Sequence, residues 1–95
     1  MKYINLINWT EQGIKAVKES PARLDKVRDM AQGLGVKVEQ AFLTMGDTDM
    51  ICIVDAPNDE AYATFALKLG ATGSVRTRSV KCFPEAEYRK IIGAL

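Results

Sequence analysis

The sequence contains no histidine, which excludes several kinds of site at once. A Ser-His-Asp triad, a Cys-His nucleophile pair, an imidazole-held zinc and a His-ligated haem all need that side chain. Cysteine is nearly as scarce, because only Cys52 and Cys82 occur and no CxxC pair exists, so a zinc ribbon or thioredoxin-like motif is absent. We expect both thiols to be reduced, buried side chains. We expect no cofactor and no bound metal.

The sequence also lacks an excess of either charge and any long apolar run. Its 13 basic and 12 acidic residues leave a net charge of +1, which gives no field to attract nucleic acid or an anionic membrane. No segment approaches the ~18 apolar residues that span a bilayer. The first residues, 1–9, are interrupted by asparagines and lack the features of a signal peptide. We therefore expect a cytoplasmic protein with neither a nucleic-acid nor a membrane partner.

What is present is typical of one globular domain spanning residues 1–95, with 47% hydrophobic and 26% charged residues. Apolar spacing and turn residues predict the order β-α-β-β-α-β plus a C-terminal helix. Ser20 before Pro21 is typical of a helix cap, as is Asn58 after Pro57. Strands are predicted at residues 3–9, 36–45, 50–54 and 73–83. A helical turn at 10–17 and helices at 20–33, 58–70 and 84–95 are predicted to connect them or follow them.

This order is that of the α+β, ferredoxin-like plan, an antiparallel four-stranded sheet with both long helices on one face. The first and third strands are then central, so the first strand separates Cys52 from Cys82 and an internal disulfide is not expected. In the second strand, simple alternation places Val38 and Phe42 on one face of the sheet, with Ala41 and Leu43 on the other.

The apolar segment 50–54 predicts that both faces of the sheet are covered. A half-solvated antiparallel strand alternates apolar and polar residues, and this segment does not. Two helices cover only one face, so we expect a second copy of the chain to cover the other, in a homodimer or a higher homo-oligomer. The alternative is that the C-terminal helix folds back over the open side.

Four residues near strand ends are candidates for ligand binding: Asn8, Trp9, Asp49 and Arg76. They could converge on the open side of the sheet as an apolar cleft with a few polar groups, which is the usual form of a small-molecule site. Each also has a simpler interpretation: Asp49 as a turn former, Trp9 as a lid on the core, and Arg76 as a charge that protects an edge strand from further pairing. No catalytic residue is assigned.

Several segments, taken in order, resemble the GYD domain family. They are Tyr3–Thr10, Val17–Pro21, Leu43–Asp49, Ile53–Glu60, Gly73–Thr77 and Phe83–Ile91. The glycine, tyrosine and aspartate of the family's name fall at Gly46, Thr48 and Asp49, so a threonine replaces the tyrosine here. The family is similar to the dimeric α+β barrel group, and the resemblance implies two ferredoxin-like sheets packed face to face. The haem-binding relatives use a proximal histidine, which this chain lacks.

The leading functional hypothesis is a non-catalytic oligomeric module that binds a small ligand or partner in a cleft between sheet and helices. The absence of histidine and of any recognisable nucleophile–base pair favours it. The alternative is a cofactor-independent, monooxygenase-like enzyme acting on a small aromatic or quinone-like substrate. In that alternative Asp49 is the base, Trp9 the platform and Arg76 the group that stabilises an anion. A purely structural subunit of a larger assembly is a third possibility.

Overall fold

The computed structural model describes all residues from 1 to 95. Its strands are β1 (Lys2–Trp9), β2 (Lys37–Leu43), β3 (Met50–Asp55) and β4 (Val75–Cys82). Its helices are α1 (Glu11–Lys15), the 3₁₀ turn η1 (Val17–Glu19), α2 (Ser20–Gln32), α3 (Asp59–Ala71) and α4 (Glu85–Gly93). None of the helices has the length and apolar character that a membrane crossing requires.

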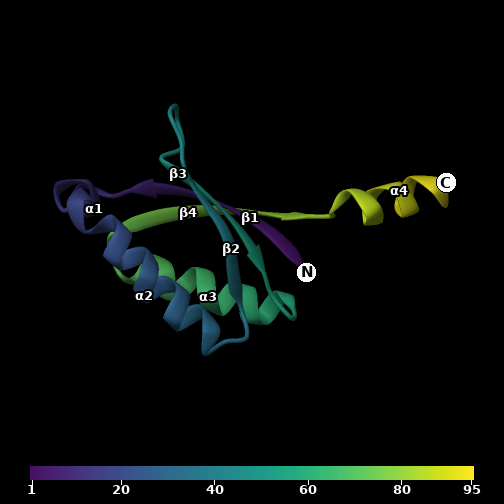
Figure 1. Ribbon diagram of the computed structural model, residues 1–95, viewed down its shortest axis with the longest axis horizontal. Helices are drawn as coiled ribbons and strands as arrows, with labels where there is room; N and C mark the ends of the chain where they lie inside the picture. The colour runs from purple at the N-terminus through teal and green to yellow at the C-terminus, as the bar shows by residue number, and fades with distance from the viewer.

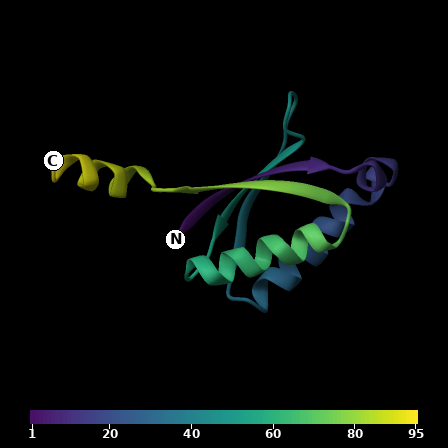
Figure 2. The same cartoon turned by 180° about the vertical axis from the view of Figure 1, so that it is seen from behind.

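The four strands form one antiparallel sheet in the order β2-β3-β1-β4. Helices α2 and α3 both lie against the same face of this sheet (Figure 1), and the view from behind shows the same arrangement (Figure 2). The α+β, ferredoxin-like prediction is therefore confirmed. Cys52 on β3 and Cys82 on β4 are both free and are separated by β1, as expected. Cys52 is buried as predicted, whereas Cys82 is only partly buried, because it ends an edge strand.

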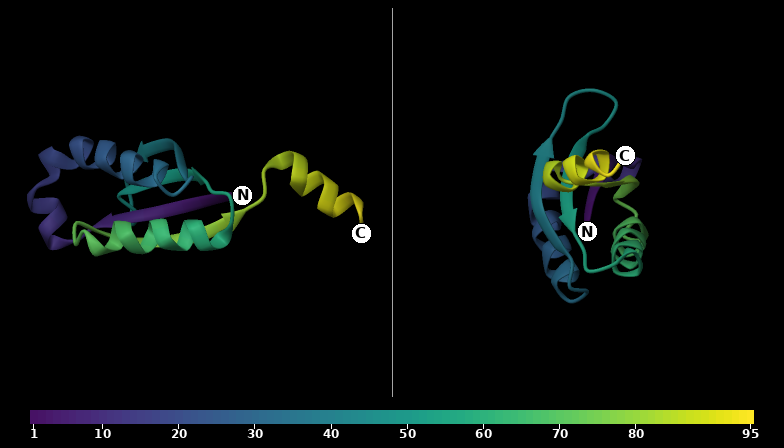
Figure 3. Two further views of the ribbon diagram at one scale, coloured as in Figure 1. Left: turned by 90° about the horizontal axis from the view of Figure 1, so that it is seen from below. Right: turned by 90° about the vertical axis from the view of Figure 1, so that its right-hand side faces the viewer.

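Helix α4 lies apart from the rest of the molecule. It follows β4 and extends away from the sheet and from α2 and α3, as Figure 1, Figure 2 and the left view of Figure 3 show. The alternative in which the C-terminal helix covers the open side of the sheet is therefore wrong for this structure. Phe83, Tyr88, Ile91, Ile92 and Leu95 are all exposed.

Of the two predicted helix caps, Asn58 is present and Ser20 is not, and Thr10 caps α1 in addition. The Thr10 hydroxyl accepts from the Gly13 N–H, and the Asn58 side chain accepts from the Ala61 N–H. Ser20 is not a cap, because η1 runs directly into α2 and gives Ser20 a helical backbone. A capping residue needs an extended backbone, which the preceding turn removes.

The core lies between the sheet and helices α2 and α3. Strand β1 alternates, with Tyr3 and Ile7 buried on the helix side and Ile4 and Leu6 on the other. The main buried apolar residues are Tyr3, Ile7, Ala31, Val36, Val38, Cys52, Val54, Ala56, Tyr62, Phe65 and Leu69. Phe65, which α3 contributes, is 1% exposed. Burying these side chains supplies the main driving force for folding.

The prediction that Val38 and Phe42 share a face of β2 is wrong, because a bulge interrupts the strand between Val38 and Gln40, whereas Ala41 and Leu43 share a face as predicted. Val38 pairs with Val54 and Ala41 pairs with Cys52, so both lie on the helix side. Phe42 pairs with Ile51 and lies on the opposite side from Val38. A bulge adds one residue to a strand and thereby reverses the alternation beyond it.

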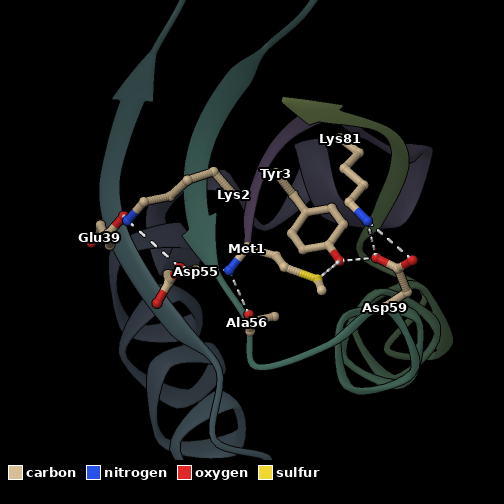
Figure 4. Close-up of polar contacts among 8 residues, drawn as sticks. All are labelled: Met1, Lys2, Tyr3, Glu39, Asp55, Ala56, Asp59 and Lys81. Carbon is tan, nitrogen blue, oxygen red and sulfur yellow. Dashed lines mark hydrogen bonds and ion pairs between the residues drawn. The ribbon is translucent and has the colours of Figure 1, made fainter. Parts of the chain in front are cut away.

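A polar network joins β1, β4 and the first turn of α3 (Figure 4). The Tyr3 hydroxyl donates to the Asp59 carboxylate, which also lies 2.9 Å from the Lys81 ammonium. The Tyr3 ring stacks on Tyr62 with ring centroids 3.9 Å apart. Burial, followed by the bond to Asp59, raises the pKa of Tyr3 to about 12. The bond from Tyr3, followed by the one from Lys81, lowers the pKa of Asp59.

Loss of stability at high pH should therefore depend on Tyr3. An unfolded tyrosine has a pKa of about 10, so the phenol holds its proton more tightly in the folded chain. The resulting stabilisation is complete below about pH 10 and is lost as the pH rises through about 12. In Tyr3→Phe the melting temperature should fall less over this range than in the unmodified chain. Tyr88→Phe, which changes an exposed tyrosine, is the control, and an equal fall in all three proteins would contradict the assignment.

Candidate functional site

A cleft of about 430 Å³ lies between the sheet and helices α2 and α3. This volume is within the usual range for small-molecule sites. We call it the helix-side cleft. Its apolar lining is Ile7, Trp9, Leu24, Val27, Met30, Val38, Met50, Cys52, Phe65, Leu69 and Val75, and its polar lining is Asn5, Ser20, Arg23, Lys26, Lys68, Thr72 and Ser74.

The charged residues of the helix-side cleft are all basic. Arg23 already serves the fold, because its guanidinium donates to the carbonyl oxygens of Ala16 at 3.0 Å and Gly13 at 3.2 Å. Lys26 on α2 and Lys68 on α3 are exposed and form no ion pair. The cleft therefore combines an apolar interior with unneutralised positive charge, and it favours a ligand that is apolar and anionic.

Helix α1 packs closely against the turn before β4, at Ser74. The Thr10 N–H donates to the Ser74 carbonyl at 3.1 Å, and the Thr10 hydroxyl donates to the Gly73 carbonyl at 2.6 Å. Gly13 is buried against the same carbonyl group, so that a Cβ atom there would overlap the Ser74 oxygen and lie 2.9 Å from the carbonyl carbon. Since Ser74 lines the helix-side cleft, this contact helps to position one of its walls.

Three of the four predicted site residues meet where β1 reaches the turn between β2 and β3. The Asp49 carboxylate accepts from the Trp9 backbone N–H at 2.9 Å and from the Asn8 amide at 3.4 Å. The Asn8 amide also donates to the Asp47 carbonyl at 2.7 Å, and the Asp49 N–H donates to the Ile7 carbonyl at 3.0 Å. These bonds attach the turn to the end of β1.

The fourth residue, Arg76, stands apart from this junction. It is opposite Asn8 in the register of β1 and β4, but it is exposed and makes no hydrogen bond or ion pair. Its neighbour Arg78 donates to the Thr48 hydroxyl at 3.0 Å. Of the four predicted residues, only Trp9 lines the helix-side cleft. A ligand-binding role for the set stays a prediction.

Asp49→Ala should lower the free energy of unfolding by about 1–2 kcal/mol, because the Trp9 N–H loses a charged acceptor. Asp49→Asn should cost less, since the amide oxygen still accepts that bond. Asp47→Ala is the matched control, because the Asn8 amide bonds to the main chain of Asp47 and not to its side chain. Urea denaturation compares the three variants. Equal stability of the two alanine variants would show that the junction does not depend on the Asp49 carboxylate.

Asn5 is a residue of the cleft that the sequence reasoning missed. It is 0% exposed, it lines the helix-side cleft, and neither its amide nitrogen nor its amide oxygen has a hydrogen-bond partner. Leaving such a group unpaired costs about 1–3 kcal/mol. The signal was present in the sequence, because Asn5 falls between the apolar Tyr3 and Ile7 on one face of an alternating strand.

The face of the sheet away from α2 and α3 is apolar at its centre. The residues that define this open face are Ile4, Leu6, Phe42, Ile51, Ile53 and Val80. Register pairs join them across the strands, with Ile4 between Ile53 and Val80, and Ile51 between Leu6 and Phe42. Phe42 is 50% exposed and Val80 is 48% exposed. A contiguous apolar patch of this kind is typical of a protein interface.

Comparison with known proteins agrees with the resemblance noted from the sequence. The model of the GYD domain matches residues 3–92. A protein of Thermus thermophilus, named glutamine synthetase and cystathionine beta-lyase binding protein, is 27% identical over 86 residues, which are 90% of each chain. No solved structure matches the chain significantly.

Proposed function

We propose, from the premise that this chain belongs to the GYD domain family, that it is a non-catalytic oligomeric binding module of the cytoplasm. In this proposal its single domain associates with a second copy through the open face and binds a protein partner. The helix-side cleft takes a small ligand. The observation that carries the proposal is the apolar open face, which no helix of the chain covers.

The composition of the open face supports self-association. Its apolar centre is bordered by polar or charged residues that include Lys2, Gln40 and Arg78. An apolar centre with a polar rim is the usual composition of a subunit interface. Two such sheets packed face to face about a two-fold axis would bury both patches, since the same surface then serves both copies.

Binding of a protein partner is supported by the name of the Thermus thermophilus relative, a binding protein for glutamine synthetase and cystathionine beta-lyase. We assign this role to α4, whose stripe of Tyr88, Ile91 and Ile92 is exposed. A helix of 9 residues is marginal in water when nothing packs against it. An amphipathic helix of this kind commonly binds by laying its apolar side in a groove of the partner.

The proposal is tested with glutamine synthetase and cystathionine beta-lyase purified from the organism that produces this chain. The unmodified chain should bind at least one of them in biolayer interferometry, and Ile91→Glu should weaken binding at least about tenfold by placing a charge in the apolar stripe. Ala86→Glu is the matched control, because Ala86 is exposed on the other side of α4. Failure of the unmodified chain to bind either enzyme, or equal binding by Ile91→Glu, would contradict the assignment to α4.

The enzyme alternative gains no specific support from the geometry. Its proposed base, Asp49, already accepts hydrogen bonds from Trp9 and Asn8. Its proposed anion stabiliser, Arg76, lies outside the helix-side cleft. The monooxygenase-like alternative therefore stays a prediction.

A further inference from the structure

Asn5 is a buried polar side chain, and no hydrogen bond within the fold compensates for the loss of its contact with water. On β3 its neighbour is Cys52 and on β4 its neighbour is Ser79, whose hydroxyl already pairs with that of Tyr62 at 2.7 Å. Neither amide atom of Asn5 forms a hydrogen bond with these groups or with any other. A buried amide without partners in an otherwise apolar wall requires an explanation, and binding of a ligand is one.

The helix-side cleft shows what kind of molecule would supply the missing bonds. A carboxamide offers one donor and one acceptor side by side, so its complement is another amide or a group with the same pattern. The surrounding wall is mainly apolar, which requires an apolar body. Lys26 and Lys68 carry the unpaired positive charge, from helices on the two sides of the cleft, and no acidic residue lines it.

We propose that the helix-side cleft binds an anionic, mainly apolar small molecule that carries an amide group. The amide pairs with the side chain of Asn5, the apolar body fills the cleft, and the negative charge lies near Lys26 and Lys68. No atom of Asn5 is exposed to solvent, so side chains of the wall must separate when the ligand enters. Met30 and Met50 belong to that wall, and their unbranched, flexible side chains can move.

Three matched probes separate the contribution of the amide to binding from that of the negative charge. N-decanoylglycine has the apolar chain, the amide and the charge. Tridecanoate keeps the charge without the amide, and N-decanoylglycinamide keeps the amide without the charge. In isothermal titration below micelle-forming concentrations, N-decanoylglycine should bind about tenfold more tightly than either analogue, since a buried hydrogen bond or charge contact contributes about that factor.

Variants then show which residues are responsible for each difference in affinity between the probes. In Asn5→Leu, N-decanoylglycine should bind no more tightly than tridecanoate. In the double variant Lys26→Gln with Lys68→Gln, it should bind no more tightly than N-decanoylglycinamide. In the unmodified chain, the side-chain amide resonances of Asn5 should shift as N-decanoylglycine is added. This measurement keeps the proposal testable even where Asn5→Leu fails to fold. Absence of binding by all three probes, or unchanged Asn5 resonances on saturation, would overturn the proposal.

Asn5→Leu should also raise the melting temperature by roughly 4–8 °C, because the variant removes an unpaired buried amide. Gln32→Leu, which changes an exposed amide on α2, is the control and should have little effect. A lower melting temperature for Asn5→Leu would show that the amide serves the fold instead of a ligand. The inference rests on the small-ligand part of the proposed function alone. Its failure would leave partner binding through α4 untouched, because that test uses different residues.

Discussion

Gly13→Ala is expected to lower the free energy of unfolding by about 3 kcal/mol, at the upper end of what overpacking costs. The added methyl group would overlap the Ser74 carbonyl oxygen, and a backbone group cannot rotate away as the end of a side chain can. Relief requires α1 to move from the turn before β4, which would also break the bonds from Thr10 to Gly73 and Ser74. Urea denaturation measures the loss.

Gly70→Ala is the matched control for this prediction. Gly70 lies within α3, and a Cβ atom there would meet nothing within 4 Å. The substitution should therefore not destabilise the chain and should stabilise it by at most about 0.5–1 kcal/mol, because alanine has a higher helix propensity than glycine and Gly70 lies in the last turn of α3. If Gly13→Ala proved as harmless as Gly70→Ala, the close packing of α1 against Ser74 would be incorrect.

If the chain self-associates through the open face as proposed, Ile53→Glu is expected to raise the dissociation constant of the homo-oligomer by at least about 100-fold. Ile53 belongs to the open face and pairs with Ile4 on β1 and Gln40 on β2, near its middle. A carboxylate buried at the centre of an apolar interface has no partner, and an uncompensated buried charge costs about 3–5 kcal/mol. Sedimentation equilibrium measures the change, and circular dichroism shows whether the subunit stays folded.

Leu67→Glu controls for the addition of a negative charge to an apolar position. Leu67 is 75% exposed on α3, away from the open face and outside the helix-side cleft. This variant should associate as the unmodified chain does. Equal dissociation constants for Ile53→Glu and the unmodified chain would show that the open face is not where the copies meet.

The fold was predictable because most of its signals are local. Asn58 caps α3 as expected, and Tyr62, Phe65 and Leu69 form its buried side. The order of these elements then leaves few topologies to choose from. The bulge in β2 was not predictable in the same way, since no glycine or proline marks it and only the pairing of Val38 and Ala41 with β3 reveals it. Because of this bulge, Phe42 lies on the opposite side of the sheet from Val38 and not on the same side as predicted.

The candidate site was predicted less well than the fold, for a physical reason. Asn8, Trp9 and Asp49 were expected together and are joined by hydrogen bonds, because all three lie at neighbouring strand ends. The helix-side cleft depends on the distance between α2 and α3, which no local pattern encodes. The position of α4 was equally unpredictable, because the same apolar stripe suits a helix that covers its own sheet or one that meets a partner.

The mass of the unmodified chain in solution tests the central claim most directly. Light scattering on the eluting peak of a size-exclusion column, at micromolar concentration, gives this mass without reference to shape. The open face, left uncovered by α2, α3 and α4, predicts at least twice the 10.5 kDa of a single chain. A peak of 10.5 kDa under these conditions would contradict self-association through the open face.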